Sequence, residues 1–352
     1  MPGELVLVTG ASSSVGGAIL RAILEAGYRV RGTGRRIDQL EELRSVPSLQ
    51  MHEQNLELVQ VPDMAAPDAF KDLLQGVTYV VHTASPMPTT GVPSNGETYD
   101  SLYVQPAVKG ALSLLETARR YPSVKRIIIT SSMSIYLSEG GENDAEKEKM
   151  LRDDDIQPVS TSPINDPLWA YRASKLAAYH AAVDFVKSEK PQYEIVHIIP
   201  SFVVGRNEKV HVSSASSSAA SDVMSGSNGI ILCPLFGIKS PQGVHGATVH
   251  VDDVAKAHTE ALTKADAGGQ NYILNSPDWN AGATYDDALD IVKRRFPDEV
   301  ASGVIPMGGT LPTIPVKIDS SKAERAFGKF KGFEEQVVDA VGQYVEMRKA
   351  GK

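Results

Sequence analysis

The N-terminal part of the chain alternates short apolar runs with amphipathic stretches. An apolar run at residues 5–8 is followed by residues 15–23, where Val, Ala and Ile recur every three to four positions, as on one face of a helix. Gly27 suits the C-terminal end of that helix. A second run with strand character follows at residues 28–33. The pattern predicts a strand, a turn, a helix and a second strand.

The same alternation continues up to residue 200. Residues 126–130 read Arg-Ile-Ile-Ile-Thr, a nearly continuous apolar run that is typical of a parallel strand covered on both faces. Strands that alternate with helices predict an α/β fold, a doubly wound parallel Rossmann sheet with right-handed crossovers, over residues 1–200. Further strands are expected at residues 56–61, 78–82 and 194–199, and helices at residues 67–74, 96–121 and 169–188.

Beyond residue 200 the pattern is less regular, and it predicts a smaller C-terminal lobe over residues 201–352. Residues 213–221 contain six serines. The surrounding stretch 211–229 buries little apolar surface, so we expect it to be mobile. Near residues 245–275 the chain is expected to return to the main sheet. Elements are predicted at residues 249–262 (strand then helix), 271–274 (strand), 284–296 and 334–348 (helices).

Composition and charge narrow the function classes. The chain of 352 residues carries 43 acidic and 35 basic residues, a net charge of −8. We therefore expect neither nucleic acid nor an anionic membrane as a partner, because both require a basic surface. Cys233 is the one cysteine, so an intrachain disulfide and a multi-cysteine zinc site are excluded. The acidic stretch 139–155 does not match a calcium-loop pattern, so no metal site is predicted.

The sequence contains no run long and apolar enough to cross a membrane, and its N-terminus lacks the pattern of a signal peptide. The expectation that follows is a cytoplasmic protein.

A loop rich in small residues connects the first predicted strand to the first predicted helix. Residues 9–16 read Thr-Gly-Ala-Ser-Ser-Ser-Val-Gly, and a helix N-terminus at this place in an α/β unit can bind the pyrophosphate of a dinucleotide. The middle glycine of the usual spacing is absent, and Ser13 or Ser14 stands there. Its side chain either holds the backbone away from the phosphate or supplies a hydrogen bond. The predicted phosphate-binding residues are Gly10, Ser12, Ser13, Ser14, Val15 and Gly16.

The end of the second predicted strand selects the cofactor. An acidic residue there would bond the ribose hydroxyls of NAD, but this chain has Arg35 and Arg36, and its first acid is Asp38. Two guanidinium groups suit the 2′-phosphate of NADPH, which is therefore the predicted cofactor (NADPH/NADP+). The alternative is that both arginines are simply solvated.

A Tyr-x-x-x-Lys spacing occurs at residues 121–125 and 171–175. Proline interrupts the first pair, whereas Tyr171 and Lys175 are predicted to lie one turn apart on a helix. The Lys175 ammonium, together with a positively charged nicotinamide ring, is expected to lower the pKa of Tyr171 from about 10 toward neutrality. Tyr171 would then exchange a proton with a carbonyl or alcohol oxygen.

Two serines follow the buried strand at residues 126–130. The carboxyl ends of parallel strands are where doubly wound sheets bind ligands. A hydroxyl of Ser131 or Ser132 at this edge could bond the substrate oxygen while charge develops on it.

Several stretches of the sequence carry a family resemblance from about Glu4 to Leu274. The chain resembles the extended short-chain dehydrogenases/reductases, and most of all the group of dihydroflavonol reductase, cinnamoyl-CoA reductase and yeast methylglyoxal (aldehyde) reductase. The matching stretches read Val-His-Thr-Ala-Ser-Pro at 81–86, Pro-Ala-Val-Lys-Gly at 106–110, Thr-Ser-Ser at 130–132, Pro-Ser-Phe-Val-Val-Gly at 200–205 and Val-His-Val-Asp-Asp-Val-Ala at 249–255.

The resemblance implies roles for individual residues. It makes Ser132, Tyr171 and Lys175 the catalytic residues, and it places Arg35 at the 2′-phosphate. Further residues implied to hold the cofactor are Asp63 and Met64 near the adenine, Thr83, Ala84 and Ser85 around the nicotinamide ribose, and Pro200, Ser201, Phe202 and Val203 beside the nicotinamide. The resemblance also makes residues 201–352 mainly a substrate-binding lobe, with the stretch 211–228 covering the substrate. The substrate is expected to contact Met87, Met133, Ser134, Tyr136, Tyr171 and Phe202.

The predicted function is an NADPH-dependent carbonyl reductase that converts a ketone or aldehyde to an alcohol. An NAD-dependent nucleotide-sugar epimerase or dehydratase on the same scaffold is the first alternative, and Arg35 and Arg36 argue against it. The second alternative is a dinucleotide sensor without catalysis, which would be expected to have lost the Tyr171/Lys175 pair. The chain is expected to be a monomer or a homodimer, since the helices predicted at 96–121 and 169–188 could pair across a twofold axis.

Overall fold

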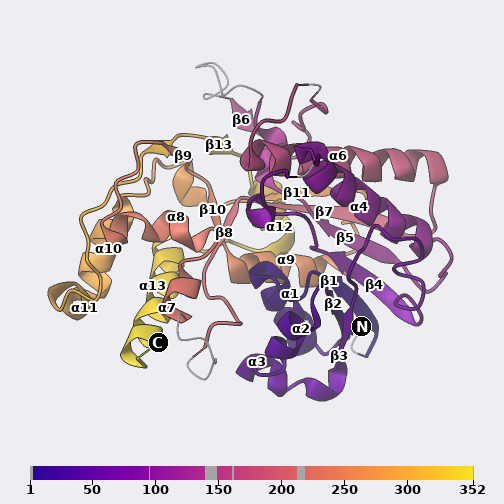
Figure 1. Ribbon diagram of the computed structural model, residues 1–352, viewed down its shortest axis with the longest axis horizontal. Coiled ribbons are helices and arrows are strands. Elements are labelled where there is room, and N and C mark those ends of the chain that lie inside the picture. The colour runs from indigo at the N-terminus through magenta and orange to yellow at the C-terminus, as the bar shows by residue number, and fades with distance from the viewer. Residues whose placement is uncertain (1–2, 95, 139–148, 161, 212–218, 352) are drawn as a thin grey trace. The chain divides into compact units, whose positions relative to one another are not determined.

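The computed structural model describes residues 3–94, 96–138, 149–160, 162–211 and 219–351. The chain forms two compact units (Figure 1). The first contains the described residues of Met1–Gly141, Asp154–Ile199 and Ala257–Asn271, and the second those of Glu142–Asp153, Pro200–Lys256 and Tyr272–Lys352.

A seven-stranded sheet has the order β11-β7-β5-β4-β1-β2-β3. Its neighbouring pairs from β7 to β3 are all parallel, and the order reverses between β1 and β4, as in a doubly wound fold. The predicted α/β fold class is therefore confirmed. The strands are β1 (Leu5–Thr9), β2 (Arg29–Gly34), β3 (Leu56–Gln60), β4 (Val77–His82), β5 (Arg126–Thr130), β7 (Glu194–Pro200) and β11 (Asn271–Leu274).

Helices follow the strands of the first unit. Gly27, with φ of 86°, ends α1 as predicted, because a left-handed residue there turns the chain toward β2. The core of this unit is built from β4 and β5 with the long helices that pack on them, and residues such as Val80, Ile127 and Leu114 are fully buried. The helices are α1 (Ser14–Glu25), α2 (Ile37–Leu43), α3 (Pro47–Gln50), a π-helical turn (Asp100–Val104), α4 (Gln105–Ala118) and α6 (Pro167–Glu189).

The second unit has its own apolar core, in which Trp279, Tyr285 and Phe333 contact one another. Short parallel strand pairs and helices surround this core. The strands are β6 (Met150–Leu151), β8 (Phe202–Val204), β9 (Val244–His245), β10 (Thr248–His250), β12 (Thr313–Ile314) and β13 (Lys317–Ile318). The helices are α7 (Ala219–Val223), α8 (Asn228–Leu232), α10 (Asp287–Arg295), α11 (Pro297–Ala301), α12 (Ser321–Phe327) and α13 (Phe333–Lys349); α9 (Val251–Ala261) begins here and ends in the first unit.

Two sequence predictions of helices need correction. Residues 67–74 form a series of turns, not a helix. Asp68 has a φ of 57°, and Lys71 N–H donates to the Asp68 carbonyl three residues back, so an α-helical ladder cannot form. The helix predicted at 96–121 begins later, with the π-helical turn, and α4 ends at Ala118.

Two predicted loops reach beyond what the structure describes. Residues 139–148 of the acidic stretch and residues 212–218 of the serine-rich stretch lie outside the described residues. Within the described part of the chain, no helix has the length and apolarity needed to cross a membrane.

Candidate active site

The loop between β1 and α1 is closed by the side chain of Ser13. Ser13 is the N-cap of α1, and its hydroxyl accepts a hydrogen bond of 2.9 Å from the Gly16 N–H. The same hydroxyl donates to the Gly10 carbonyl at 2.9 Å. The serine at the place of the missing glycine therefore uses its hydroxyl within the loop, and it stabilises the helix N-terminus.

Two positions in this loop require glycine. Gly10 has a φ of 71°, and a Cβ there would lie 2.7 Å from the Thr83 hydroxyl. A Cβ on Gly16 would lie 2.1 Å from the Gly10 carbonyl oxygen. The first turn of α1 carries no acidic residue, and helix geometry leaves the N–H groups of Ser14 and Val15 without an intrahelical acceptor. A tightly packed loop that leads into a helix N-terminus with free N–H groups, and without a nearby negative charge, fits a bound pyrophosphate.

The two arginines after β2 differ in their surroundings. Arg36 donates two hydrogen bonds to the Asp38 carboxylate, one of them 3.1 Å long from Nε. This ion pair raises the pKa of Arg36. The Arg35 side chain is exposed, and among the described residues it has no ion pair. Of the two cations, Arg35 is thus the one whose guanidinium is available for a phosphate.

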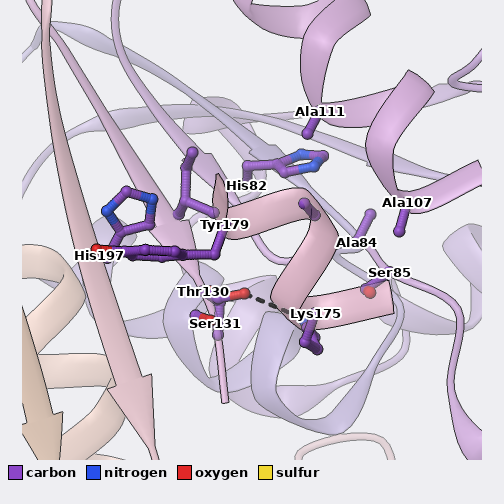
Figure 2. Close-up of a pocket in the computed structure, with 12 residues that line it drawn as sticks. His82, Ala84, Ser85, Ala107, Ala111, Thr130, Ser131, Lys175, Tyr179 and His197 are labelled. Atoms are coloured by element: carbon purple, nitrogen blue, oxygen red, sulfur yellow. Dashed lines mark hydrogen bonds between the residues drawn. The ribbon is translucent and has the colours of Figure 1, made fainter. Parts of the chain in front are cut away.

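The three predicted catalytic residues lie together in the first unit. Ser132 follows β5 directly, and its hydroxyl lies close enough to Tyr171 on α6 to influence the pKa of the phenol. Lys175 lies one turn further along α6, with Nζ 6.0 Å from the centroid of the Tyr171 ring. Its Nζ donates to the Thr130 carbonyl at 3.0 Å, as Figure 2 shows. The end of β5 and one face of α6 thus bring a serine hydroxyl, a phenol and an ammonium together.

The predicted direction of the Tyr171 pKa is wrong for the protein chain by itself. Burial raises the pKa of Tyr171, and the opposing influence of the nearby Ser132 hydroxyl only partly offsets this. Burial also lowers the pKa of Lys175 to about 8, so its ammonium loses the proton at a lower pH than an exposed lysine does. Lowering of the Tyr171 pKa by a bound nicotinamide stays a prediction.

Residues after β4 are tied to the end of β1. The Thr83 hydroxyl donates to the Thr9 carbonyl at 2.6 Å, and the Ala84 N–H donates to the Thr9 hydroxyl at 3.3 Å. The Thr9 hydroxyl also contacts Nδ1 of His82 at 2.8 Å. Thr83, Ala84 and Ser85 thus follow β4 at the carboxyl edge of the sheet, where the strand order reverses between β1 and β4. This is the usual ligand-binding position in such a sheet.

The remaining predicted residues are spread over both units. In the first unit, the exposed Asp63 carboxylate accepts a hydrogen bond from the Ala65 N–H, and Met64 packs against the apolar core. Also in this unit, Met133 and Tyr136 are buried, Ser134 is half-buried and Met87 is 52% exposed. Pro200, Ser201, Phe202 and Val203 belong to the second unit, where the Phe202 N–H donates to the Ala247 carbonyl.

Sequence analysis missed three buried histidines near the carboxyl ends of the strands. His82 and His197 line a small cavity of about 20 Å³ together with Lys175, Ser131 and Tyr179 (Figure 2). Burial lowers the pKa of both histidines to about 4, so both are neutral at physiological pH. The third, His258 on α9, is fully buried and contacts the Thr130 hydroxyl through Nε2 at 2.8 Å. For His82 and His197, a histidine inside an otherwise apolar strand is the sequence signal that could have identified them.

No group of three or more His, Cys, Asp or Glu side chains suited to a metal ion is found among the residues that the structure describes.

Comparisons with known proteins cover almost the whole chain. A sequence model of the NAD dependent epimerase/dehydratase family matches residues 6–277. The chain is 34% identical over 356 residues to ketoreductase CTB6 of Cercospora beticola, and the match covers 99% of this chain and 96% of that protein. It is 27% identical to the putative NADPH-dependent methylglyoxal reductase GRP2 of Candida albicans, over 97% of this chain and 98% of that protein.

Among solved structures, the fold resembles that of Gre2 from Candida albicans in complex with NADPH. The TM-score is 0.79 and the sequences are 28% identical, with 97% of this chain and 99% of that chain covered.

Proposed function

The chain belongs to the NAD dependent epimerase/dehydratase family, as its resemblance to extended short-chain dehydrogenases/reductases predicts, and we propose that it is an NADPH-dependent carbonyl reductase. The observation that carries the proposal is the grouping of three side chains: the Ser132 hydroxyl lies near Tyr171, and the buried Lys175 has its Nζ 6.0 Å from the centroid of the Tyr171 ring. Relatives named as a ketoreductase and a methylglyoxal reductase support a carbonyl substrate.

The chain's own residues would divide the work of reduction. When bound, the nicotinamide supplies the hydride for the carbonyl carbon. Tyr171 donates its proton to the carbonyl oxygen, and Ser132 holds that oxygen by a hydrogen bond as negative charge develops. Lys175, charged below a pKa of about 8, stabilises the phenolate that Tyr171 leaves behind.

Cofactor binding would use the loop after β1 and the arginine after β2. The N–H groups at the start of α1 would receive the pyrophosphate, in a loop whose tight packing depends on Gly10 and Gly16. The guanidinium of Arg35, which has no ion pair among the described residues, would receive the 2′-phosphate.

A substrate panel tests this function. The purified protein should oxidise NADPH, measured by absorbance, when aldehydes or ketones are added, and Tyr171→Phe should abolish most of that oxidation. Tyr121→Phe is the matched control, because Tyr121 lies beyond the end of α4 and contacts the Lys71 carbonyl. If the purified protein retains NAD and epimerises a nucleotide sugar, or if no carbonyl compound is reduced, the proposal is wrong.

A further inference from the structure

Thr130, the last residue of β5, contacts two helices through different atoms. Its backbone carbonyl accepts the hydrogen bond of 3.0 Å from Lys175 Nζ on α6. Its side-chain hydroxyl contacts Nε2 of His258 on α9 at 2.8 Å. His258 and Lys175 are both buried in the first unit. One residue therefore connects a buried histidine to the ammonium of the proposed active site.

The register of the sheet explains why the Thr130 carbonyl is available to Lys175. On one side, β4 pairs with β5 only up to the partners His82 and Ile129. On the other side, the next N–H, that of Ser131, donates to the Ile198 carbonyl of β7. Backbone groups of successive strand residues point to alternate sides, so the Thr130 carbonyl points past the end of β4, toward no strand.

The orientation of this carbonyl matters because Lys175 is buried. A buried ammonium needs its hydrogen bonds, since it has lost most of its contact with water. The bond to Thr130 is the one that the described residues show for Lys175 Nζ. A small shift of the end of β5 would lengthen this bond and also move Ser131 and Ser132, which follow directly.

We propose that His258 is a positioning residue for carbonyl reduction: through the Thr130 hydroxyl it fixes the end of β5, so that the Thr130 carbonyl holds the Lys175 ammonium. The inference rests on the proposed function. His258 touches neither Tyr171 nor Ser132 in any contact that the structure shows, and the proposed effect on the reaction passes through its contact with the Thr130 hydroxyl. No proton changes place in this arrangement.

Other ionisable groups also face Lys175. Tyr171 and Tyr179 face it from α6, His82 from β4 and His197 from β7. The helix α4 contributes only Ala107 and Ala111 to the same surroundings. Burial, and after it the charge of Lys175, lowers the pKa of His82 to about 4, so His82 is a neutral neighbour at physiological pH. A substitution of His258 leaves all of these groups in the sequence. A change in the pKa of Lys175 would therefore report the loss of the contact between His258 and Thr130.

The decisive variant is Thr130→Val, which removes the hydroxyl but keeps the size of the side chain and the carbonyl. The pKa of Lys175, measured by NMR of isotopically labelled lysine without substrate or cofactor, should fall by about 0.5–1 pH unit, because a weakened hydrogen bond favours the charged form less. With a carbonyl substrate, kcat should fall about tenfold, since roughly 1.4 kcal/mol of lost stabilisation corresponds to that factor. The basic limb of the kcat profile should move to lower pH, and KM for NADPH should change little.

Two controls separate positioning from general damage. Thr117→Val removes another buried hydroxyl, which bonds the Ser113 carbonyl within α4, and it should leave the Lys175 pKa and kcat unchanged. His258→Leu should reproduce the effects of Thr130→Val, and the double variant should be no worse than either single one, because both break the same connection. His258→Gln, which can still bond the Thr130 hydroxyl, should restore most of kcat.

The outcomes distinguish this inference from the proposed function. An unchanged Lys175 pKa in Thr130→Val, or additive losses in the double variant, would overturn the positioning role while leaving carbonyl reduction intact. A changed Lys175 pKa in an enzyme that reduces no carbonyl compound would support the connection but overturn the proposed function.

Discussion

Replacing Arg35 by alanine is the sharpest test of the cofactor. Arg35 follows the carboxyl end of β2, its side chain is exposed, and the described residues offer it no ion pair. Arg36 is different, because its guanidinium is already bound twice by the carboxylate of Asp38. A 2′-phosphate that arrives at this edge would therefore find Arg35 available at once, whereas Arg36 must first leave Asp38.

The size of the effect follows from the charge-assisted hydrogen bonds at stake. Each one lost costs about 1.5–3 kcal/mol. Since about 1.4 kcal/mol is a factor of ten, Arg35→Ala should raise KM for NADPH by roughly 10–100-fold. The same substitution should hardly change KM for NADH, which lacks the phosphate. Arg36→Ala should act in the same direction but more weakly, because part of its hydrogen-bonding capacity is used by Asp38.

Steady-state kinetics with both cofactors, at low and at high salt, measure this difference. Salt should weaken NADPH binding more than NADH binding in the wild type, because it screens the extra charge pair. In Arg35→Ala, the salt dependence of NADPH binding should become more similar to that of NADH binding. A wild-type enzyme that prefers NADH, or an equal loss for both cofactors in Arg35→Ala, would refute the reasoning and return weight to an NAD-dependent epimerase.

The remaining predictions concern catalysis, packing and pH. Tyr171→Phe should lower kcat by a factor of about 10²–10⁴, which is the usual contribution of a positioned general acid. The affinity for NADPH, measured by calorimetry, should stay unchanged. A variant that keeps the wild-type turnover would exclude Tyr171 as the acid. Gly16→Ala places a Cβ 2.1 Å from a carbonyl oxygen and should abolish cofactor binding in the same assay, whereas Gly342→Ala in α13 meets no atom within 4 Å. Gly342→Ala should therefore raise the free energy of unfolding by about 0.5–1 kcal/mol, as measured with urea. Burial lowers the pKa of His82 and His197 to about 4, below the ordinary 6.5, so the unfolded chain binds these protons first as pH falls. The free energy of unfolding should then fall between pH 6.5 and 4, by up to about 3 kcal/mol for each histidine, and a flat profile in urea unfolding would contradict this.

The parts of the fold that depend on local pattern were predicted correctly. The apolar run before the two serines is β5, because a strand covered on both faces has to be apolar throughout. The turns at residues 67–74 were not predicted. Phe70 and Leu74 are buried at helical spacing, but the positive φ of Asp68 interrupts the helix. No residue type in this stretch predicts that positive φ. Burial fixes which side chains face the core, and it does not by itself fix the backbone between them.

The proposed catalytic pair was also predicted from local geometry, since Tyr171 and Lys175 are four residues apart on one helix. The connection from Lys175 through Thr130 to His258 is of another kind. It joins α6, the end of β5 and α9, so it depends on how far β4 extends and on which face of α9 is buried. Such information is spread over more than half of the chain, and neither spacing nor composition contains it.

The serine in the phosphate loop shows the same limit at short range. From the sequence, the side chain at the place of the missing glycine could either hold the backbone away from a phosphate or bond it. The structure shows Ser13 with its hydroxyl between the Gly10 carbonyl and the Gly16 N–H, because its extended backbone makes it the N-cap of α1. The hydroxyl takes up one N–H that a phosphate could otherwise bind and leaves those of Ser14 and Val15 at the open end of the helix. The loop therefore compensates for the lost glycine by capping its own helix, and the binding of the pyrophosphate is left to the backbone around it.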